Sequence, residues 1–404
     1  MKLLFLSLMY EPEKEAEFKQ KIHGSMPNAV NTFQKMLLSG LVNNLKADDL
    51  HIVNSYPFGV FKKGYDQLHF PSGNFTARNN ANDVNLACWN LPFLKQRNRC
   101  VNAYREMKKY ISQNRGEKIC ILIYTLYRPY LKAANKIRRK FSDKQTCVIV
   151  TDLPGKYGLL PKKGIMRKVR LIHSDMILKQ AQGIDKFVYL TDAMRIPMRT
   201  EKKPYIVVEG IAPDTPYSSE NASEKKEKRV FMYAGSFLRE FCVEEFAQAF
   251  SRISDKDIEL WLCGNAPESI RALADKDARI KCLGYLTKDE VSKLQAQADF
   301  LVNPRPNRGE YVKYSFPSKT MEYLAAGKPV LMYKLDGIPD EYDEYLNYIQ
   351  GETVEQIQNS VSAILQSDYE KLKEKAKRGQ EFVLTKKCST VQAKKILDFL
   401  AETE

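Results

Sequence analysis

Short apolar runs alternate with polar, helix-compatible stretches along the chain, and this alternation constrains the fold more than any other feature. Continuous apolar strands separated by helices are typical of parallel sheets covered on both faces. The sequence therefore predicts an α/β protein built of doubly wound sheets. The runs are Leu3–Leu8, Leu50–Val53, Ile119–Tyr124, Cys147–Val150, Phe187–Leu190, Tyr205–Val208, Val230–Ala234, Ile258–Cys263, Ile280–Leu283, Phe300–Asn303 and Val330–Tyr333.

A length of 404 residues favours two domains over a single core. Residues 212–229 are polar and charged, so we expect a linker there, between an N-terminal domain (1–211) and a C-terminal domain (230–385). For the last helix, in 386–404, a return to the N-terminal domain is one option that the sequence leaves open. Helices are expected at Thr32–Leu41, Val243–Arg252, Pro267–Ala274, Lys288–Ala298, Ser318–Ala326, Val354–Gln366, 369–383 and 391–402.

The net charge of +15 is unevenly distributed along the chain. Residues 1–200 hold 34 basic and 15 acidic residues, whereas the remainder holds 30 basic and 34 acidic residues. A basic first half favours a polyanionic partner, either nucleic acid or an anionic membrane surface. Stretches 128–144 and 156–170 interleave cations with apolar residues, which fits a solvated helix face or a helix lying on a bilayer, and we favour the bilayer. No nucleic-acid recognition motif is present, so nucleic acid is not expected.

Several classes of protein are disfavoured by what the sequence lacks. No apolar run is long enough to cross a bilayer. We interpret the start as a buried strand rather than a signal peptide, because acidic residues follow it at once, and therefore expect a cytoplasmic protein. The cysteines form no C-x-x-C pair and the histidines are scattered, which indicates reduced buried thiols and no zinc site. No G-x-G-x-x-G follows the first strand, which argues against a dinucleotide dehydrogenase.

Residues 315–331, SFPSKTMEYLAAGKPVL, are the most informative stretch for function. The Phe316-Pro317 turn leads into a helix that starts at Ser318, carries one acid at Glu322 and stops at Gly327. Free N–H groups at a helix start suit a phosphate. A carboxylate one turn further on suits a ribose diol, so the stretch predicts a bound nucleoside diphosphate.

Glycine turns follow the first three strands of the second half, at Gly235-Ser236, Gly264-Asn265 and Gly284-Tyr285-Leu286. Each of them taken alone is equally consistent with an ordinary strand-to-helix turn. The fourth strand is followed by residues 303–314, a loop with three cations that leads directly into the Ser318 helix. Because ligands of doubly wound sheets bind at the carboxyl ends of the strands, these loops are candidates for one binding site.

Residues 230–333 resemble the nucleotide-sugar-binding half of family-four glycosyltransferases, whose GT-B fold has two Rossmann-like domains facing across a cleft. The resemblance rests on VFMYAGSF, ELWLCGN, RIKCLGYLTKDEVSKLQAQADFLVNP and SFPSKTMEYLAAGKPVL in this order. It implies that Glu322 holds the ribose hydroxyls, that Gly235-Ser236 and the 315–319 turn hold the diphosphate, and that 284–286 flank the base. The implied nucleotide-sugar-binding residues are Gly24, Gly235, Ser236, Arg239, Gly264, Asn265, Tyr285, Leu286, Lys313, Tyr314, Ser315, Phe316, Ser318, Lys319 and Glu322.

Two departures from the family pattern concern charge. The family commonly has an Arg and a Lys in and after the first glycine turn, whereas this chain has Ser236 and then Phe241-Cys242. Arg239, Arg305, Lys313 and Lys319 are the candidates to replace them. The family also commonly has a glutamate eight positions before Glu322; Tyr314 stands there, and Glu310 is a nearby substitute.

In the family the N-terminal domain binds the acceptor and supplies a polar residue that faces the sugar. The loop from His23 to Asn31 looks like the acceptor loop, with Gly24 allowing close approach to donor phosphate, although His23 fits an exposed loop residue equally well. Asp152 follows the strand 147–150 near the place where family members carry a catalytic-site His or Asp; a turn-forming Asp is the alternative. The catalytic candidates are Asp152, His23 and Glu310.

The resemblance implies retaining sugar transfer from a nucleotide-sugar to a saccharide acceptor, often lipid-linked, in bacterial exopolysaccharide, capsule or O-antigen assembly. We expect a peripheral location on the inner face of the plasma membrane. No Asp-x-Asp follows a strand, so neither a metal nor another cofactor is expected. A GT-B nucleotide-sugar epimerase is the main alternative, and a basic nucleic-acid-binding protein is a weaker one.

Overall fold

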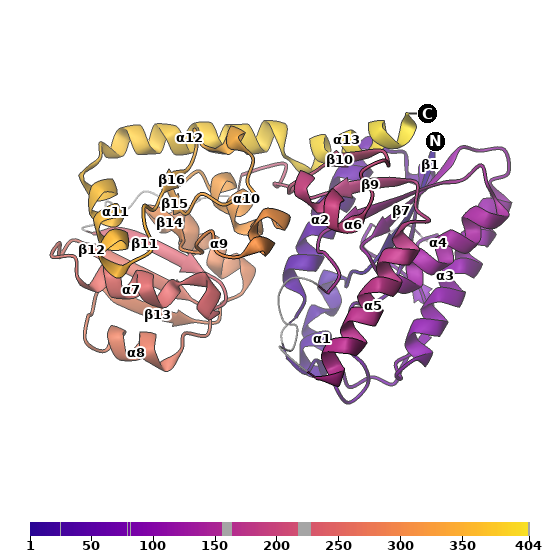
Figure 1. The fold of residues 1–404 in the computed structure, drawn as a ribbon, viewed down its shortest axis with the longest axis horizontal. Coiled ribbons are helices and arrows are strands. Elements are labelled where there is room, and N and C mark those ends of the chain that lie inside the picture. Colours follow the sequence, from indigo (N-terminus) through magenta and orange to yellow (C-terminus); the bar gives the residue numbers. More distant parts are fainter. Residues whose placement is uncertain (25, 79, 81, 156–163, 217–227, 403–404) are drawn as a thin grey trace. The chain divides into compact units, whose positions relative to one another are not determined.

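The computed structural model describes residues 1–24, 26–78, 80, 82–155, 164–216 and 228–402, and these divide into two compact units (Figure 1). Unit 1 comprises Met1–Ile211 and Ser389–Glu404, and unit 2 comprises Ala212–Cys388. Most of the predicted linker, residues 217–227 of 212–229, lies outside the described residues, as do residues 156–163 of the basic stretch 156–170.

Unit 1 is built around a sheet with the strand order β10-β9-β8-β7-β1-β2-β5-β4. The neighbouring strands are parallel except for β4 and β5. Strand β7 is buried along its whole length and β1 along all but its first residue, which explains their continuous apolar sequence. The strands are β1 (Lys2–Ser7), β2 (Leu50–Asn54), β4 (Gly73–Asn74), β5 (Val84–Asn85), β7 (Ile119–Tyr124), β8 (Gln145–Val150), β9 (Lys186–Tyr189) and β10 (Tyr205–Val207), with a separate antiparallel pair, β3 (His69–Phe70) and β6 (Cys88–Trp89).

The last helix of the chain packs into unit 1 against the second helix, and Ile396 and Leu400 belong to the apolar core there. Gly40 permits this approach, because a Cβ at that position would lie 1.9 Å from the carbonyl oxygen of Ser389. The helices of unit 1 are α1 (Glu15–Lys21), α2 (Asn28–Asn44), α3 (Leu94–Gln113), α4 (Arg128–Lys140), α5 (Ile165–Ala181), α6 (Arg195–Met198) and α13 (Ser389–Ala401), with 3-10 turns at Pro12–Lys14, Ala47–Asp49 and Asp192–Met194.

Unit 2 has a parallel sheet with the strand order β13-β12-β11-β14-β15-β16. Its strands are β11 (Arg229–Ala234), β12 (Ile258–Cys263), β13 (Ile280–Gly284), β14 (Phe300–Asn303), β15 (Val330–Met332) and β16 (Asn347–Tyr348). Its helices are α7 (Val243–Ser251), α8 (Glu268–Ala274), α9 (Lys288–Gln297), α10 (Ser318–Ala325), α11 (Val354–Gln366) and α12 (Tyr369–Lys386), with 3-10 turns at Arg239–Phe241, Glu310–Tyr314 and Asp340–Tyr342.

Each apolar run of the sequence forms a strand whose bounds lie within two residues of those predicted. The start of α2 is an error of the sequence analysis. The helix begins at Asn28, directly after the N-cap residue Pro27, rather than at Thr32. The cysteines are reduced thiols and, apart from the exposed Cys282, they are buried. In the described part of the chain, no helix combines the length and the apolar character that a membrane span requires.

Candidate active site

The sheet of unit 2 has a topological switch point between β11 and β14. The chain continues from β11 to β12 and β13 on one side, whereas β14 is followed by β15 and β16 on the other. In open parallel sheets the loops diverge at such a point and leave a crevice at the carboxyl ends of the two strands. Gly235 follows β11 and the 303–314 loop follows β14, so both lie at this edge.

Lys319 lies directly against the Gly235 turn. A Cβ at Gly235 would be 2.6 Å from Nζ of Lys319, so only glycine allows the ammonium to come this close. The same ammonium lies 5.6 Å from the ring centroid of Tyr233, and the Tyr233 hydroxyl donates a hydrogen bond of 2.6 Å to the carbonyl of Ser236. The α10 helix therefore brings a cation to the turn that carries no cation of its own.

The three glycine turns pack against one another. Gly235 N–H donates to the carbonyl of Cys263 at 2.9 Å, and Gly264 N–H donates to the carbonyl of Gly284 at 2.7 Å. A Cβ at Gly264 would lie 2.2 Å from the Gly235 carbonyl oxygen, so this contact also requires glycine. The predicted turns after β11, β12 and β13 thus form one continuous layer of backbone.

A second cation, Arg305, comes from the loop after β14. Its guanidinium donates to Oγ of Ser315 at 3.2 Å and lies 5.1 Å from the ring centroid of Tyr311. Burial lowers the pKa of Lys319, and Arg305 lowers it further, while Glu322 acts in the opposite direction. No carboxylate among the described residues forms an ion pair with Arg305. The edge therefore holds positive charge that the protein itself does not fully neutralise.

Glu322 is half-buried on the second turn of α10. Its carboxylate accepts no hydrogen bond from the residues that the structure describes, although it acts electrostatically on Lys319. At the start of α10, the N-cap residue Pro317 provides no side-chain cap. Thr320 N–H donates to the Pro317 carbonyl at 2.9 Å, whereas the N–H groups of Ser318 and Lys319 have no hydrogen-bond partner among the described residues. Backbone donors, the Lys319 ammonium and one acceptor carboxylate thus share the N-terminal half of this helix.

The other predicted residues of unit 2 differ in their partners and in their exposure. Oε1 of Glu310 accepts a hydrogen bond from the Tyr314 hydroxyl at 3.0 Å and pairs with Nζ of Lys313 at 3.3 Å. Phe316 is buried and its ring centroid lies 5.5 Å from that of Tyr342, which fixes the turn before α10. Exposed surface positions are held by Ser236, Arg239, Asn265, Tyr285 and Ser318, whereas Leu286 is half-buried.

The predicted residues of unit 1 have local partners. Nε2 of His23 pairs with Asp66 at 2.9 Å, and Asp152 accepts a hydrogen bond of 3.3 Å from the Thr151 hydroxyl at the end of β8. Gly24 has a φ of +112° and open space around a Cβ position. Within the described residues, no hydrogen bond or ion pair joins His23 to Asp152.

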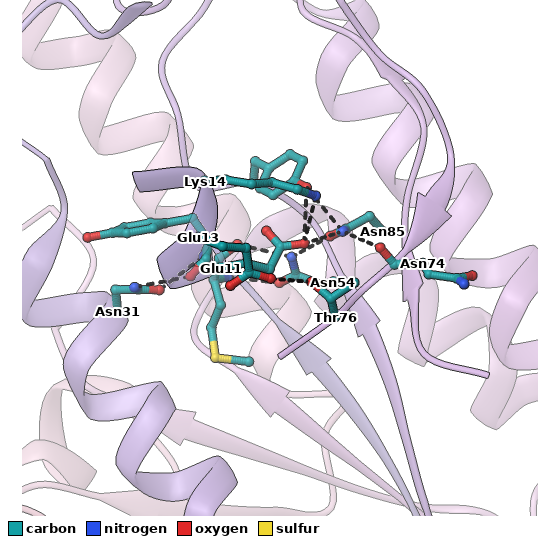
Figure 2. A network of polar contacts seen from close by, with 11 residues as sticks. Glu11, Glu13, Lys14, Asn31, Asn54, Asn74, Thr76 and Asn85 are labelled. Carbon is teal, nitrogen blue, oxygen red and sulfur yellow. Dashed lines mark hydrogen bonds and ion pairs between the residues drawn. The ribbon is translucent and has the colours of Figure 1, made fainter. Parts of the chain in front are cut away.

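A buried polar network at the carboxyl edge of the unit 1 sheet was not predicted from the sequence (Figure 2). Three side-chain amides each bond both the N–H and the C=O of one residue in the segment that leaves β1. Such two-point contacts satisfy the backbone groups of the segment, as pairing with a neighbouring strand would. The pairs are Gln34 with Leu8 (2.8 and 2.7 Å), Asn54 with Met9 (2.8 and 3.0 Å) and Asn31 with Tyr10 (3.0 and 3.3 Å).

Glu11 lies at the end of this segment and is fully buried. Its Oε1 accepts from Asn85 at 2.9 Å, from Lys14 at 3.2 Å and from the Tyr56 hydroxyl at 3.3 Å. Asn85 is in turn the acceptor for Asn54 at 2.7 Å. The signal in the sequence was a polar residue at or shortly after the end of each of three strands, but which residues meet depends on the strand order.

The two parallel sheets with helices between their strands define a GT-B glycosyltransferase fold, and the solved structures that resemble this chain have it. An E. coli trehalose-6-phosphate structure bound with UDP-2-fluoro glucose has a TM-score of 0.66 at 10% identity, covering 100% of both chains. A sucrose-phosphate synthase from Thermosynechococcus elongatus has a TM-score of 0.64 at 14% identity, covering 98% of both. A UDP-forming α,α-trehalose-phosphate synthase from Burkholderia xenovorans, in complex with glucose-6-phosphate, has 0.64 at 8%, covering 99% of this chain and 100% of the other.

Residues 228–367 match the family described as Glycosyl transferases group 1. The chain therefore carries a glycosyltransferase domain in unit 2 and is an enzyme of this broad class. The match spans the β11 turn, the 303–314 loop and α10, so it includes the charged edge described above. No curated protein matches the sequence. At such low identity the structural likeness carries the fold and not the substrate.

Proposed function

We propose that the chain is a retaining family-four glycosyltransferase that moves a sugar from a nucleotide-sugar donor to a saccharide acceptor in cell-surface polysaccharide synthesis. The observation that carries this proposal is the convergence of Lys319, the Gly235 turn and Glu322 at the switch point of the unit 2 sheet. Cations and free N–H groups suit a diphosphate, and an unbonded carboxylate one turn away suits a ribose.

In this proposal Lys319 and Arg305 replace the cations that the family commonly carries after the first glycine turn. Negative charge builds up on the nucleoside diphosphate as it leaves the sugar. Fixed cations and backbone donors stabilise that charge without reorganisation, which lowers the barrier to transfer. Arg305 is suited to this role because Ser315 and Tyr311 orient its guanidinium while no described carboxylate neutralises it.

The remaining roles follow the resemblance. Residues 284–286 flank the base, where the exposed ring of Tyr285 offers a stacking surface. Glu310 contacts the sugar in place of the acid that is missing at Tyr314, and its bonds to Tyr314 and Lys313 orient it. The resemblance assigns Asp152 and His23 of unit 1 to the catalytic step and to the acceptor.

The acceptor that we propose is a lipid-linked or free oligosaccharide, reached by an enzyme bound peripherally to the inner face of the plasma membrane. The basic composition of residues 1–200 supports this assignment, because an anionic surface attracts both the enzyme and a pyrophosphate-linked acceptor. The similar solved structures include a sucrose-phosphate synthase and a trehalose-phosphate synthase in complex with glucose-6-phosphate. A sugar phosphate is therefore the competing class of acceptor. Transfer assays with a sugar phosphate and with a lipid-linked pyrophosphate sugar distinguish the two classes.

The proposal is tested first by a thermal-shift series with UDP, GDP, ADP, CDP and dTDP. A ligand that binds only the folded state raises its melting temperature, so one nucleotide should give a clear shift. Glu322→Ala should abolish the shift and weaken affinity about 100-fold, since two hydrogen bonds to a carboxylate are lost. Glu355→Ala, an exposed acid on α11, is the matched control and should respond as wild type does. An unchanged response of Glu322→Ala would overturn the placement of the nucleotide.

Transfer itself is tested by product formation. Nucleotide release that depends on added acceptor is expected for a transferase, whereas release or sugar interconversion without acceptor would indicate the epimerase alternative. We further predict that EDTA leaves the activity unchanged. Among the described residues no group of three His, Cys, Asp or Glu side chains is placed to hold a metal ion, but metal independence stays a prediction until activity is measured.

A further inference from the structure

Large apolar side chains are exposed on unit 1 around the start of α3. Residues 91–94, Leu-Pro-Phe-Leu, are all exposed, and Phe93 is 91% exposed. Trp89 on β6 is 47% exposed, and the centroid of its ring lies 4.7 Å from the ring centroid of His69 on β3. Exposed apolar groups that gather in one place mark a binding surface more often than single ones do. We refer to Leu68, Trp89, Leu91, Phe93 and Leu94 as the α3 patch.

Hydrogen bonds hold the backbone around the α3 patch. Lys95 is buried and donates to the carbonyls of Phe58 and Gly59, the latter at 3.0 Å, and Asn90 N–H donates to the carbonyl of Leu68 at 2.7 Å. Phe93 itself has a φ of 60°, which non-glycine residues adopt at a cost. The fold therefore projects this ring outward from a fixed backbone.

A second exposed apolar group lies at the start of α5. Ile165, Val169, Ile172 and Met176 follow the spacing i, i+4, i+7 and i+11, which places them on one face of the helix. Ile165 is 79% exposed, and Val169 and Ile172 are each more than half exposed. The positions that α5 buries, such as Ser174 and Ile177, lie on a different face. The apolar face of α5 is thus turned away from its own domain.

The two groups lie at the same end of one helical layer. Helices α3, α4 and α5 directly precede the parallel strands β7, β8 and β9, so each helix starts at the carboxyl edge of the sheet. Figure 1 shows the three helices side by side, and α4 packs against both of the others. Packed helices lie roughly 10 Å apart, so the two apolar groups are roughly 20 Å apart.

Positive charge predominates around these apolar groups, although two exposed acids, Asp66 and Asp175, lie at their margins. No acidic residue occurs in the sequence between Asp83 and Glu106 or between Asp152 and Asp175. Lys62, Lys63 and Arg97 are exposed beside the α3 patch, and Lys132 is exposed on the second turn of α4, between the two groups. Tryptophan, phenylalanine and leucine surrounded by lysine and arginine form the composition of a surface that enters the headgroup region of an anionic bilayer.

The geometry points to a two-point membrane anchor on unit 1, in which Trp89 and Phe93 of the α3 patch and the apolar face of α5 enter an anionic bilayer. The cations on and beside α4 bind the headgroups between these two points. The inference names the membrane partner of the proposed function and rests on that function for its biological sense. The exposed residues and their charge do not depend on the donor site.

Trp89 can report its own environment. The chain has two tryptophans, so the full-length Trp261→Phe variant leaves Trp89 alone. With vesicles of phosphatidylcholine and 30% phosphatidylglycerol, the emission of Trp89 should shift to shorter wavelength and be quenched by lipids brominated near the headgroup. Vesicles of phosphatidylcholine alone should bind at least tenfold less. Binding without any shift or quenching, or equal binding to neutral vesicles, would overturn the inference.

A matched pair of double variants tests the residues by vesicle flotation. Leu91→Ser/Phe93→Ser should reduce binding at least tenfold, whereas Val42→Ser/Ile196→Ser, which removes exposed apolar groups from α2 and α6, should leave it unchanged. Unchanged circular dichroism and nucleotide-induced melting shifts would show that both variants fold and that unit 2 is intact. A concentration-dependent dimer that only the first variant dissolves would identify a second copy as the occupant and overturn the inference. Failure of nucleotide binding in wild type would instead count against the proposed function.

Discussion

The polar side chains at the carboxyl edges of the two sheets differ in their hydrogen bonding. In unit 1, Asn54, Asn85 and Glu11 bond to one another and to backbone, and all three are buried. In unit 2, Glu322 accepts no hydrogen bond from a described residue, and Nζ of Lys319 lies against the Gly235 turn. The first edge uses its hydrogen bonds to hold its own chain, whereas the second keeps charge and bonding capacity available for a ligand.

This difference separates a structural from a functional use of polar groups. Apart from Oε2 of Glu11, which is buried without a hydrogen-bond partner among the described residues, the network of unit 1 is bonded within the protein. A network bonded in this way mainly stabilises one conformation. Side chains with unused bonding capacity contribute little to folding, so their presence at a switch point is best explained by a ligand. Substitutions in unit 2 should therefore change donor binding more than stability, and those in the network of unit 1 should do the reverse.

The largest effect is expected from removing both cations of unit 2. The double variant Arg305→Ala/Lys319→Ala should weaken nucleoside diphosphate binding about 1,000-fold, because charge-assisted hydrogen bonds contribute roughly 2 kcal/mol each. Calorimetric titration measures the affinity, and the melting temperature without ligand should change little. Lys281→Ala/Lys288→Ala, which removes two exposed cations of the same unit, serves as the control. Equal losses in both variants would contradict a specific diphosphate site.

Asn54→Leu tests the network of unit 1. The change removes four hydrogen bonds of a buried amide and leaves the backbone of Met9 without its partners, so we expect a loss of roughly 3 kcal/mol in the free energy of unfolding. Urea unfolding measures it as a lower midpoint at unchanged slope. Asn43→Leu, at an exposed position of α2, should cost less than about 0.5 kcal/mol. A destabilisation of Asn54→Leu no larger than that would mean that the network is not structural.

Gly264→Ala should change both stability and nucleotide binding. The new Cβ would lie 2.2 Å from the Gly235 carbonyl, so the turn must shift at a cost of about 2 kcal/mol. We expect nucleotide affinity to fall as well, because a shift would move the Gly235 turn, against which Nζ of Lys319 lies. Gly284→Ala has open space around its Cβ and only a φ of +71° to strain, which costs about 1 kcal/mol. If both variants bound nucleotide equally well, the layer of glycine turns would be irrelevant to the donor.

The smallest predicted effect is a pH dependence. The pKa of Lys319 is lowered, chiefly by burial and then by Arg305. Only the protonated ammonium attracts the diphosphate, so affinity should fall as pH rises, and the fall should begin below the ordinary lysine pKa of 10.5. Above the pKa the slope should not exceed tenfold per pH unit, as one proton is involved. Lys319→Arg keeps its charge and should remove the dependence; a slope that persists in this variant would assign it to another group.

The sequence predicted the fold well because periodicity and turn residues act locally. Strands of four or more residues, such as Ile258–Cys263, stand out as continuous apolar runs between turn signals. Two-residue strands such as β16 and the β3–β6 pair show no such pattern, because their pairing depends on distant segments. The start of α2 was misplaced because polar residues at a helix start resemble loop residues.

The candidate site was predicted in outline but not in detail. The glycine turns and the acid of α10 follow strands, so their edge of the sheet could be inferred from order alone. Four cations were equally good candidates to neutralise the diphosphate, and only the fold distinguishes Lys319, which contacts Gly235, from Lys313, which pairs with Glu310. The network around Glu11 was missed because its members are far apart in the sequence.

A crystal structure of the full chain with the nucleoside diphosphate that gives the largest melting shift would test the central claim most directly. We predict density at the start of α10, with the diphosphate against Lys319, Arg305 and the Gly235 turn, and with both ribose hydroxyls on Glu322. Ordered nucleotide anywhere else, with this edge of the unit 2 sheet empty, would contradict the account.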